Sequence, residues 1–177
     1  PAARFSVRLE RKSAVDGKAV IGPYGLDEPE FYVSFNRGEG LKPLSMVASG
    51  GELSRLMLAL KSVLAKADGV PTMIFDEVDT GIGGEVAIGV GLHLAALATS
   101  KQVLCITHLA SIAARADTHY KVEKRAEGER TVTCVYALDR AQSVKELARM
   151  LSGDPDGQAS LAHAEDLLQK LGSTRGS

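Results

Sequence analysis

The order of apolar and polar residues predicts strands and helices that alternate through the centre of the chain. Residues 5–9 and 31–35 alternate between the two classes, which is typical of half-buried strands. Residues 51–66 instead repeat apolar side chains every three or four positions, which predicts a helix with one apolar face. That face comprises Leu53, Leu56, Met57, Leu60, Val63 and Leu64. Short apolar runs at residues 72–75 and 102–106 predict strands that are buried on both faces.

The second half of the chain predicts helices around one antiparallel hairpin. The expected elements are a helix over residues 83–98 with Val86, Val90, Leu94 and Leu97 turned inward, a short helix over 109–115, hairpin strands over 118–124 and 131–138, and a last helix over 157–171. Before the last helix, Ser143 followed three residues later by Glu146 predicts a helix start with a capping box. Alternating strands and helices imply largely parallel central strands covered by helices, so the expected fold class is α/β with antiparallel flanking strands.

The composition is that of one globular domain and narrows the classes of function. The chain has 177 residues, 45% of them apolar, and a net charge of -1. A near-neutral chain argues against a dedicated polyanion-binding domain, but does not exclude DNA contact through a local patch. No apolar run reaches the roughly 18 residues needed to cross a bilayer. No secretory leader is present either, so we expect a cytoplasmic protein with no membrane partner.

The two ends of the chain are expected to be truncated, because Pro1 is no natural initiator. Residues 1–171 are expected to form one domain, and residues 172–177 a flexible tail. Cys105 and Cys134 lie in apolar stretches without a C-x-x-C partner, which indicates reduced, buried thiols.

Three short motifs carry the candidate chemistry, and Ser49-Gly50-Gly51 is the first of them. It precedes a predicted helix, where unpaired backbone N–H groups and the helix dipole favour an anion. The glycines let the backbone approach that anion without a Cβ clash, and the hydroxyl of Ser49 is free to bond a phosphate oxygen. An ordinary serine N-cap also fits these residues and is the more frequent outcome for such a motif alone.

The second motif, Asp76-Glu77, directly follows the apolar run of residues 72–75. Asp76 suits Mg²⁺, a hard cation that takes carboxylates, often through its own waters. Glu77 suits a base that orients or deprotonates an attacking water. The alternative is a pair of solvated acids in a turn, which the four preceding apolar residues disfavour.

The third motif, Thr107-His108, ends the next predicted strand. Ligands of α/β sheets bind beyond the carboxyl ends of the strands, so His108 is expected near Glu77, within reach of a phosphate or a water. A lone histidine is more often structural. Asp79 lies in the glycine-rich turn after Glu77, and that turn taken alone fits a plain connector.

Together, these motifs resemble the second half of an ATPase head of the ABC superfamily in its SMC-like branch. Residues 48–55 resemble the ABC signature, residues 74–77 the Walker B strand with its glutamate, residues 78–82 the D-loop, and Thr107-His108 the switch histidine. The amino-acid sequences of residues 36–44 and 75–84 are similar to those of the bacterial RecN family of DNA double-strand-break repair proteins. The resemblance covers roughly residues 30–151, and it is highly specific from the signature through the D-loop. A Walker A motif, G-x-x-x-x-G-K-[ST], does not occur in the chain.

The resemblance implies the C-terminal lobe of a P-loop ATPase head whose N-terminal lobe carries Walker A beyond a long coiled coil. It implies ATP and Mg²⁺ as ligands, a second head as the ATP-linked homodimer partner, and DNA as the target of the full, nucleoid-associated protein. The implied nucleotide-binding residues are Ser49, Gly50, Gly51, Glu52 and Asp79, with Ser49 acting on the γ-phosphate of the other head. In its own head, Asp76 would hold Mg²⁺, and Glu77 and His108 would be catalytic. Without Walker A, this segment alone would be nearly inactive.

Other interpretations fit the motifs less well. One alternative is another SMC-like head, either chromosome-organising or nuclease-associated. The sequence of residues 78–82 disfavours it. A non-catalytic scaffold that only docks to its partner lobe is disfavoured by the intact Glu77, whose loss would be the simplest way to end hydrolysis. A transporter ATPase fits least, because Ala48 stands where transporters carry leucine.

Overall fold

The computed structural model describes residues 3–11, 21–23, 25–47, 49–65, 67, 69–128 and 130–172. The chain divides into two compact units, Pro1–Leu53 and Ser54–Ser177. Helix α1 (Gly50–Leu64) begins in the first unit and continues in the second. The predicted tail after Gly172 lies outside the described residues, as does Ala48 at the start of the signature.

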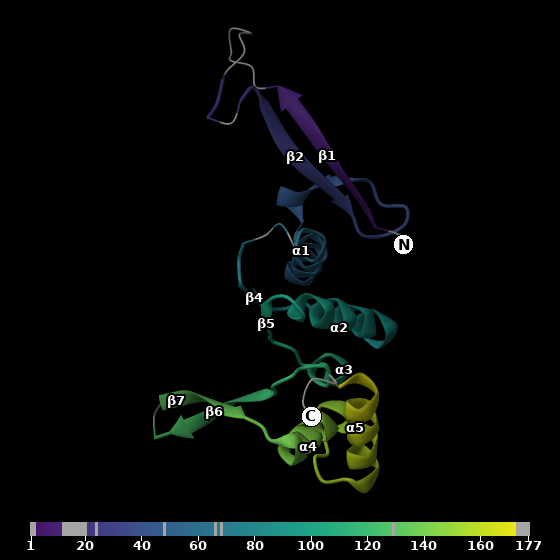
Figure 1. Cartoon of the computed structure of the whole chain (residues 1–177), viewed down its shortest axis with the longest axis vertical. Helices are drawn as coiled ribbons and strands as arrows, with labels where there is room; N and C mark the ends of the chain where they lie inside the picture. The colour runs from purple at the N-terminus through teal and green to yellow at the C-terminus, as the bar shows by residue number, and fades with distance from the viewer. Residues whose placement is uncertain are drawn as a thin grey trace. The chain divides into compact units, whose positions relative to one another are not determined.

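The first unit is built on an antiparallel hairpin of β1 (Arg4–Arg11) and β2 (Asp27–Ser34), shown in Figure 1. The short strand β3 (Lys42–Pro43) pairs with the other edge of β2, and a 3-10 turn, η1 (Leu44–Met46), follows it. Both strands predicted from alternation in this unit are therefore confirmed.

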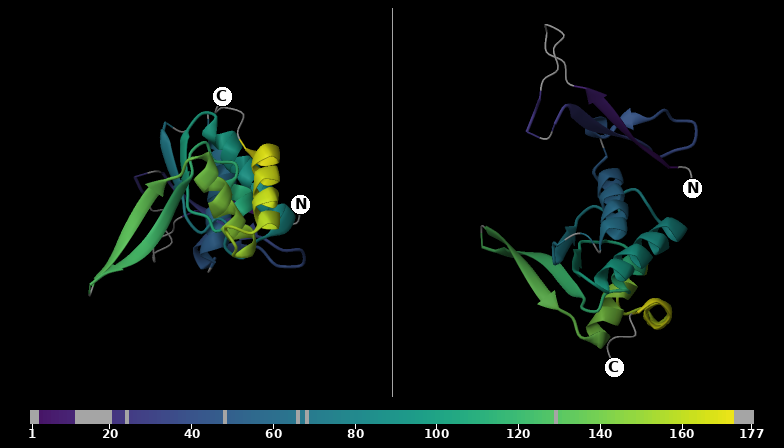
Figure 2. Two further views of the ribbon diagram at one scale, coloured as in Figure 1. Left: turned by 90° about the horizontal axis from the view of Figure 1, so that it is seen from below. Right: turned by 45° about the horizontal axis from the view of Figure 1, so that its top comes forward.

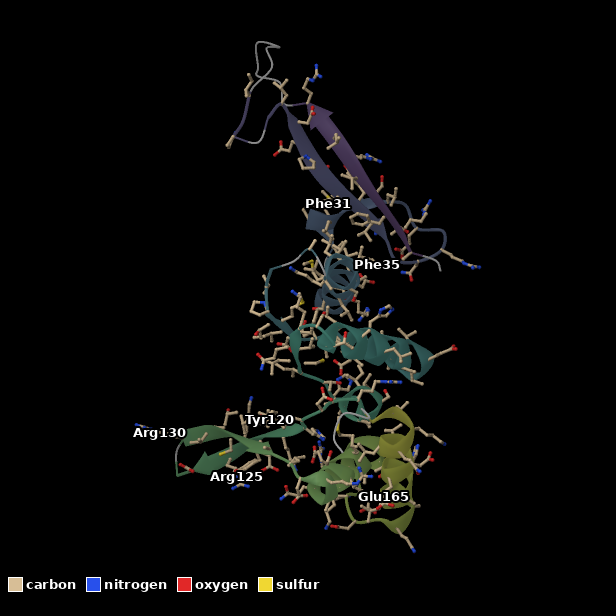
Figure 3. The ribbon with its side chains drawn as sticks, viewed as in Figure 1. Phe31, Phe35, Tyr120, Arg125, Arg130 and Glu165 are labelled. Atoms are coloured by element: carbon tan, nitrogen blue, oxygen red, sulfur yellow. The ribbon has the colours of Figure 1, made fainter. Side chains whose placement is uncertain are left out.

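One face of this hairpin is apolar but exposed, which differs from the half-buried strands that were predicted. The side chains on this face that remain exposed are Phe5, Val7, Leu9 and Phe31, while Val33 is buried. The rings of Phe5 and Phe31 stack with centroids 5.7 Å apart, and Figure 3 shows Phe31 on β2. The opposite face is polar, because alternate residues of a strand point to opposite sides.

The second unit begins with a β-α-β arrangement of β4 (Thr72–Phe75), α2 (Gly84–Ala98) and β5 (Gln102–Cys105). The two strands are parallel, with Thr72 opposite Gln102 and Phe75 opposite Cys105. Helix α2 lies along one face of this pair (Figure 1) and shares a core with it. The buried members of this core are Leu58, Met73, Phe75, Val78, Val90, Leu94, Leu97 and Ile112.

The prediction that β4 and β5 are buried on both faces is wrong for this chain. Ile74 is 69% exposed, Leu104 44% and Ile106 60%, all on the face turned away from the core. The cause is that Leu58, α2 and Ile112 cover only the face of Met73 and Phe75. We call the three exposed side chains the bare face of the β4–β5 pair.

Two helix faces also differ from their predictions. Val86 of α2 is exposed, and the neighbouring Ala87 takes its place in the interior. In α1 the buried large side chain is that of Leu58, on the opposite side from the predicted apolar face, whose members Leu53 and Met57 are exposed. The more apolar side of α1 is therefore not the side that enters the core of the second unit.

A second core joins the last helices of the chain. They are α3 (Ala110–Ala113), α4 (Arg140–Ser152) and α5 (Gln158–Leu171), and the buried residues between them are Ala110, Ala113, Ala114, Val144, Leu147, Ala148 and Ala164. The predicted hairpin is confirmed as β6 (Tyr120–Glu127) and β7 (Arg130–Ala137), which extends away from α4 and α5 in Figure 2.

The predicted capping box of α4 is wrong by one turn. The helix begins at Arg140, and Asp139 and Gln142 form the box by bonding to each other's backbone N–H. Ser143 and Glu146 are buried instead. Glu146 accepts bonds from Lys121 of the β6–β7 hairpin and from Arg149, so the predicted capping acid ties the hairpin to α4.

Candidate functional site

The candidate residues of the second unit lie where β4 and β5 end. The parallel pairing brings both carboxyl ends to one edge, and the N–H of Ile106 donates to the carbonyl of Phe75 at 3.0 Å. The turn of residues 76–82 therefore leaves this edge beside the loop of residues 106–109. Sequence reasoning anticipated that these two strand ends lie at one edge of the sheet.

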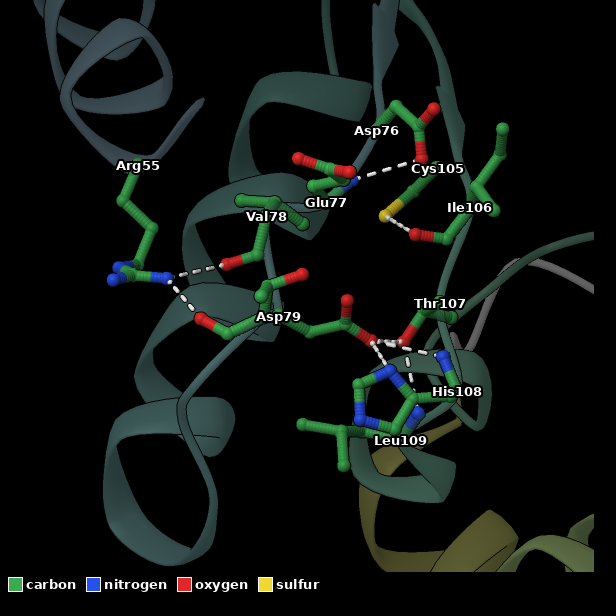
Figure 4. A network of polar contacts seen from close by, with 11 residues as sticks. Arg55, Asp76, Glu77, Val78, Asp79, Cys105, Ile106, Thr107, His108 and Leu109 are labelled. Carbon is green, nitrogen blue, oxygen red and sulfur yellow. Dashed lines mark hydrogen bonds and ion pairs between the residues drawn. The ribbon is translucent and has the colours of Figure 1, made fainter. Parts of the chain in front are cut away.

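The carboxylate of Asp79 joins the two segments, as Figure 4 shows. Asp79 is 3% exposed, and its Oδ2 accepts hydrogen bonds from the Thr107 hydroxyl and from the His108 backbone N–H at 2.9 Å. The Nδ1 of His108 lies 3.2 Å from the same oxygen. Thr107 in turn accepts a bond from the N–H of Leu109 at 3.0 Å. A buried carboxylate needs hydrogen-bond donors, and these groups supply them to Asp79. Their bonds to Asp79 in turn fix the position of the loop that carries His108.

This contact orients the imidazole of His108 outward. Its side chain is 68% exposed, and Nδ1 is the nitrogen that faces Asp79. A carboxylate at Nδ1 favours a proton on that nitrogen, which leaves Nε2 as the nitrogen available to a ligand.

The backbone reverses direction at Glu77. Among the described residues, Glu77 is the only non-glycine residue with a positive φ, at 57°. Such a conformation costs of order 1–3 kcal/mol and persists only where its surroundings impose it. Here Val78 is fully buried in the core while Glu77 and Asp76 stay exposed. The reversal thus keeps the two candidate carboxylates on the surface at the strand end.

Asp76 fits a site for Mg²⁺ through its chemistry. Its Oδ1 accepts a bond from the N–H of Glu77 at 2.9 Å, and the rest of the exposed carboxylate faces outward. Among the described residues, no group of three or more His, Cys, Asp or Glu side chains could hold a metal ion. One carboxylate suffices for Mg²⁺, because this ion keeps several waters and binds phosphate oxygens of the substrate.

Cys105, at the end of β5, is a protonated thiol. Burial, together with the negative charges of Asp79 and Asp76, raises its pKa to about 12. A thiol, unlike a thiolate, is a poor nucleophile, so Cys105 is not a candidate for covalent chemistry here.

Two residues of α1 contact the same turn and were missed by the sequence analysis. The Ser54 hydroxyl donates to the carbonyl of Asp76 at 2.8 Å. One guanidinium nitrogen of Arg55 donates to the carbonyls of Val78 at 3.3 Å and Thr80 at 2.9 Å. The available signal was their spacing. Ser54 and Arg55 lie four and three residues before Leu58, so they share its side of the helix, which is otherwise polar.

The Ser49 motif belongs to the first unit and forms the start of α1. The Ser49 hydroxyl accepts a bond from the N–H of Glu52 at 3.4 Å, and its carbonyl accepts one from Leu53 at 3.1 Å. This is the geometry of a serine N-cap, with Gly50, Gly51 and Glu52 in the first turn. The cap bond is long and Ser49 is exposed, so the hydroxyl can still donate to another group.

Within the described part of the chain, no helix combines the length and the apolar character that a membrane crossing requires.

Asp79→Asn should destabilise the chain by about 1–3 kcal/mol, because the neutral amide oxygen is a weaker acceptor for the donors of Thr107 and His108 than the carboxylate, and the amide nitrogen brings a new donor into the buried site. Urea unfolding measures the change. Asp156→Asn is the matched control, since Asp156 forms an exposed ion pair with Lys145 and its loss should cost under about 1 kcal/mol. Equal effects of the two substitutions would contradict the central role of Asp79.

Comparison with known proteins places the sequence among DNA repair proteins. The chain is 52% identical over 166 residues to the DNA repair protein RecN of Treponema pallidum, a match that covers 94% of this chain and 29% of that protein. RecN of Deinococcus radiodurans is 53% identical over 155 residues, or 88% of this chain and 27% of that protein. The chain thus spans less than a third of the length of these relatives. No model of a known protein family matches it.

Solved structures with the same fold are heads of SMC ATPases. The Smc head domain of Pyrococcus yayanosii, solved with a coiled coil and joint, has a TM-score of 0.58 at 22% identity and matches 84% of this chain and 26% of its own. A chain from a study of ATP-driven dimerization and DNA-stimulated activation of SMC ATPases has a TM-score of 0.51, also at 22% identity, and matches 84% of this chain and 82% of its own. Fold and sequence agree: over the part that it spans, the chain is similar in sequence to RecN DNA repair proteins and has the α/β fold of an SMC ATPase head.

Proposed function

We propose that the chain is the C-terminal lobe of the ATP-hydrolysing head of a RecN-like, SMC-type protein that acts in DNA double-strand-break repair and recombination. The observation that carries this proposal is that exposed Asp76 and Glu77 follow the end of β4, that His108 follows the paired end of β5, and that buried Asp79 bonds to the loop of His108. An edge beyond the carboxyl ends of parallel strands is where α/β folds bind ligands.

Each side chain has a role in ATP hydrolysis that suits its geometry. Glu77 orients the attacking water and accepts its proton, and its exposed position at the strand end leaves room for that water. His108 presents Nε2 toward the γ-phosphate, because Asp79 holds Nδ1. Asp76 would hold Mg²⁺, which would supply positive charge against the negative charge that develops on the phosphate oxygens.

The partner that completes the nucleotide site is the lobe of the same protein that carries Walker A. No such motif occurs in the 177 residues, so the loop that cradles the β- and γ-phosphates must come from elsewhere. The bare face of Ile74, Leu104 and Ile106 supports a missing neighbour, since parallel sheets are covered on both faces in folded proteins. The relatives are more than three times as long as the part that matches, which provides the chain for that neighbour.

A second head completes the assembly. Exposed Ser49 precedes helix α1, whose first turn opens with two glycines before Glu52, and the exposed start of this helix suits contact with a phosphate presented by another head. Ser49, Gly50, Gly51 and Glu52 thus act in trans, while Asp76, Glu77, Asp79 and His108 act on the nucleotide of their own head. The full protein binds DNA in the nucleoid of the cytoplasm, as expected of a repair protein.

A docking scaffold without catalysis is the second candidate, because the bare face by itself needs only a partner lobe. The exposed Glu77, kept outside by its positive φ, favours hydrolysis over this alternative. A head of another SMC-like protein is disfavoured by the identity of 52% and 53% to the RecN relatives.

In the full-length protein, Glu77→Gln should leave ATP binding intact and slow turnover by roughly 10²–10⁴-fold, because the amide cannot accept the proton of the attacking water. Steady-state hydrolysis together with nucleotide binding measures both effects. Glu85→Gln, in the first turn of α2, is the matched control and should keep the wild-type rate. Wild-type turnover in Glu77→Gln would favour the docking scaffold.

Ser49→Arg should abolish the ATP-dependent dimer of heads, because it places bulk and positive charge on the surface that meets the other head. Each head should still bind ATP, since Ser49 is not part of the Walker A cradle. Sedimentation with ATP on a Glu77→Gln background measures the dimer, and Ser45→Arg, an exposed serine in η1, is the control. A cap role alone predicts a loss of about 1 kcal/mol of stability with the dimer spared. A persistent dimer would therefore overturn the signature assignment.

A further inference from the structure

We propose that Arg55, assisted by Ser54, is a positioning residue that holds the turn of Glu77 and Asp79 against helix α1. This inference rests on the proposed function and deepens it. It makes the helix that begins at Ser49 the support of the hydrolytic residues of the same head.

The carbonyls that Arg55 holds are those on either side of Asp79. Its guanidinium donates to the carbonyls of Val78 and Thr80, while the Asp79 carboxylate points the other way, to Thr107 and His108 (Figure 4). The backbone of Asp79 is thus fixed from one side by an arginine, and its side chain is fixed from the other by the loop of His108. A shift of this backbone has to move His108 as well.

The turn needs such an outside support because it has few backbone hydrogen bonds of its own and holds Glu77 in the left-handed region. Glu77 has φ at 57° and Gly81 at 72°, so the backbone takes two left-handed residues within five. The backbone bonds inside the turn are those from Thr80 to Glu77 at 3.1 Å and from Ile82 to Asp79 at 3.4 Å. A left-handed glutamate persists only where the surroundings impose it.

Ser54 holds the beginning of the same turn. Its hydroxyl donates to the carbonyl of Asp76, the residue directly before Glu77. Glu77 therefore lies between two backbone positions, Asp76 and Val78, that are both bonded to side chains of α1. Helix α1 runs without interruption from Gly50 to Leu64, so these two side chains follow the Ser49 cap within two turns.

Arginine suits this task better than lysine. One guanidinium presents five donors in a fixed plane, and it can bridge two carbonyls while staying charged. Both bonds come from one guanidinium nitrogen, whose N–H groups are fixed in the plane of the group. A lysine ammonium rotates freely on a flexible stem, so Arg55→Lys should hold the two carbonyls less firmly.

The test uses the full-length protein and compares Arg55→Ala, Arg55→Lys and Asp79→Asn with wild type. Arg140→Ala is the matched control, because Arg140 is an exposed arginine in the first turn of α4. The measured quantities are kcat and KM for ATP, the ATP-dependent dimer on a Glu77→Gln background, and the melting temperature.

Arg55→Ala should lower kcat by on the order of 10²-fold, since an error of about 1 Å in a reacting group has that effect. KM for ATP and the dimer should stay near wild type, because neither the phosphate loop nor Ser49 is touched. Arg55→Lys should regain part of kcat. On the Asp79→Asn background, the effect of Arg55→Ala should shrink, because both substitutions release the same turn.

Three results would overturn the inference while the proposed function stands. The first is an unchanged kcat in Arg55→Ala. The second is a fall in kcat no larger than the loss of folded protein. The third is a double variant of Arg55→Ala and Asp79→Asn in which the two effects on kcat simply multiply. A wild-type protein without ATPase activity would instead overturn the proposed function, and this inference with it.

Discussion

The candidate site depends on one buried carboxylate. Asp79 is excluded from solvent, and a buried charge is tolerated only where donors surround it. Thr107 and His108 supply those donors from the next strand end, so the turn after β4 and the loop after β5 are fixed in one arrangement. The outward position of the imidazole follows from that arrangement. The residue that orders the site is therefore one that itself lies below the surface.

Much of the fold could be predicted from the sequence because its elements have distinct periods. The run of residues 72–75 is bounded by Pro71 and Asp76, and it is a strand at those limits. Burial was harder to predict. Ile74 is as apolar as its neighbours but is exposed, because the pattern of one strand does not say which partner covers its second face. For the same reason the apolar face of α1 was assigned to the wrong side.

The parts of the site that follow from the order of strands along the chain could be predicted, and the parts that depend on contacts between elements were missed. Asp76-Glu77 and Thr107-His108 follow two consecutive strands, and parallel pairing brings such ends together. The contacts of Ser54 and Arg55 depend on the direction in which α1 faces, and that direction follows from the burial of Leu58. The capping box of α4 was misplaced because two capping patterns lie close together in the sequence. Ser143 with Glu146 was chosen, but Asp139 with Gln142 forms the box.

The central claim is that this chain carries hydrolytic residues for a nucleotide that it cannot hold by itself. Calorimetric titration of Mg²⁺–ATP tests it most directly, first into the chain alone and then into the chain combined with the remainder of the protein. The account predicts no measurable binding to the chain alone and clear binding once the Walker A lobe is present. Micromolar affinity of the isolated chain would contradict it.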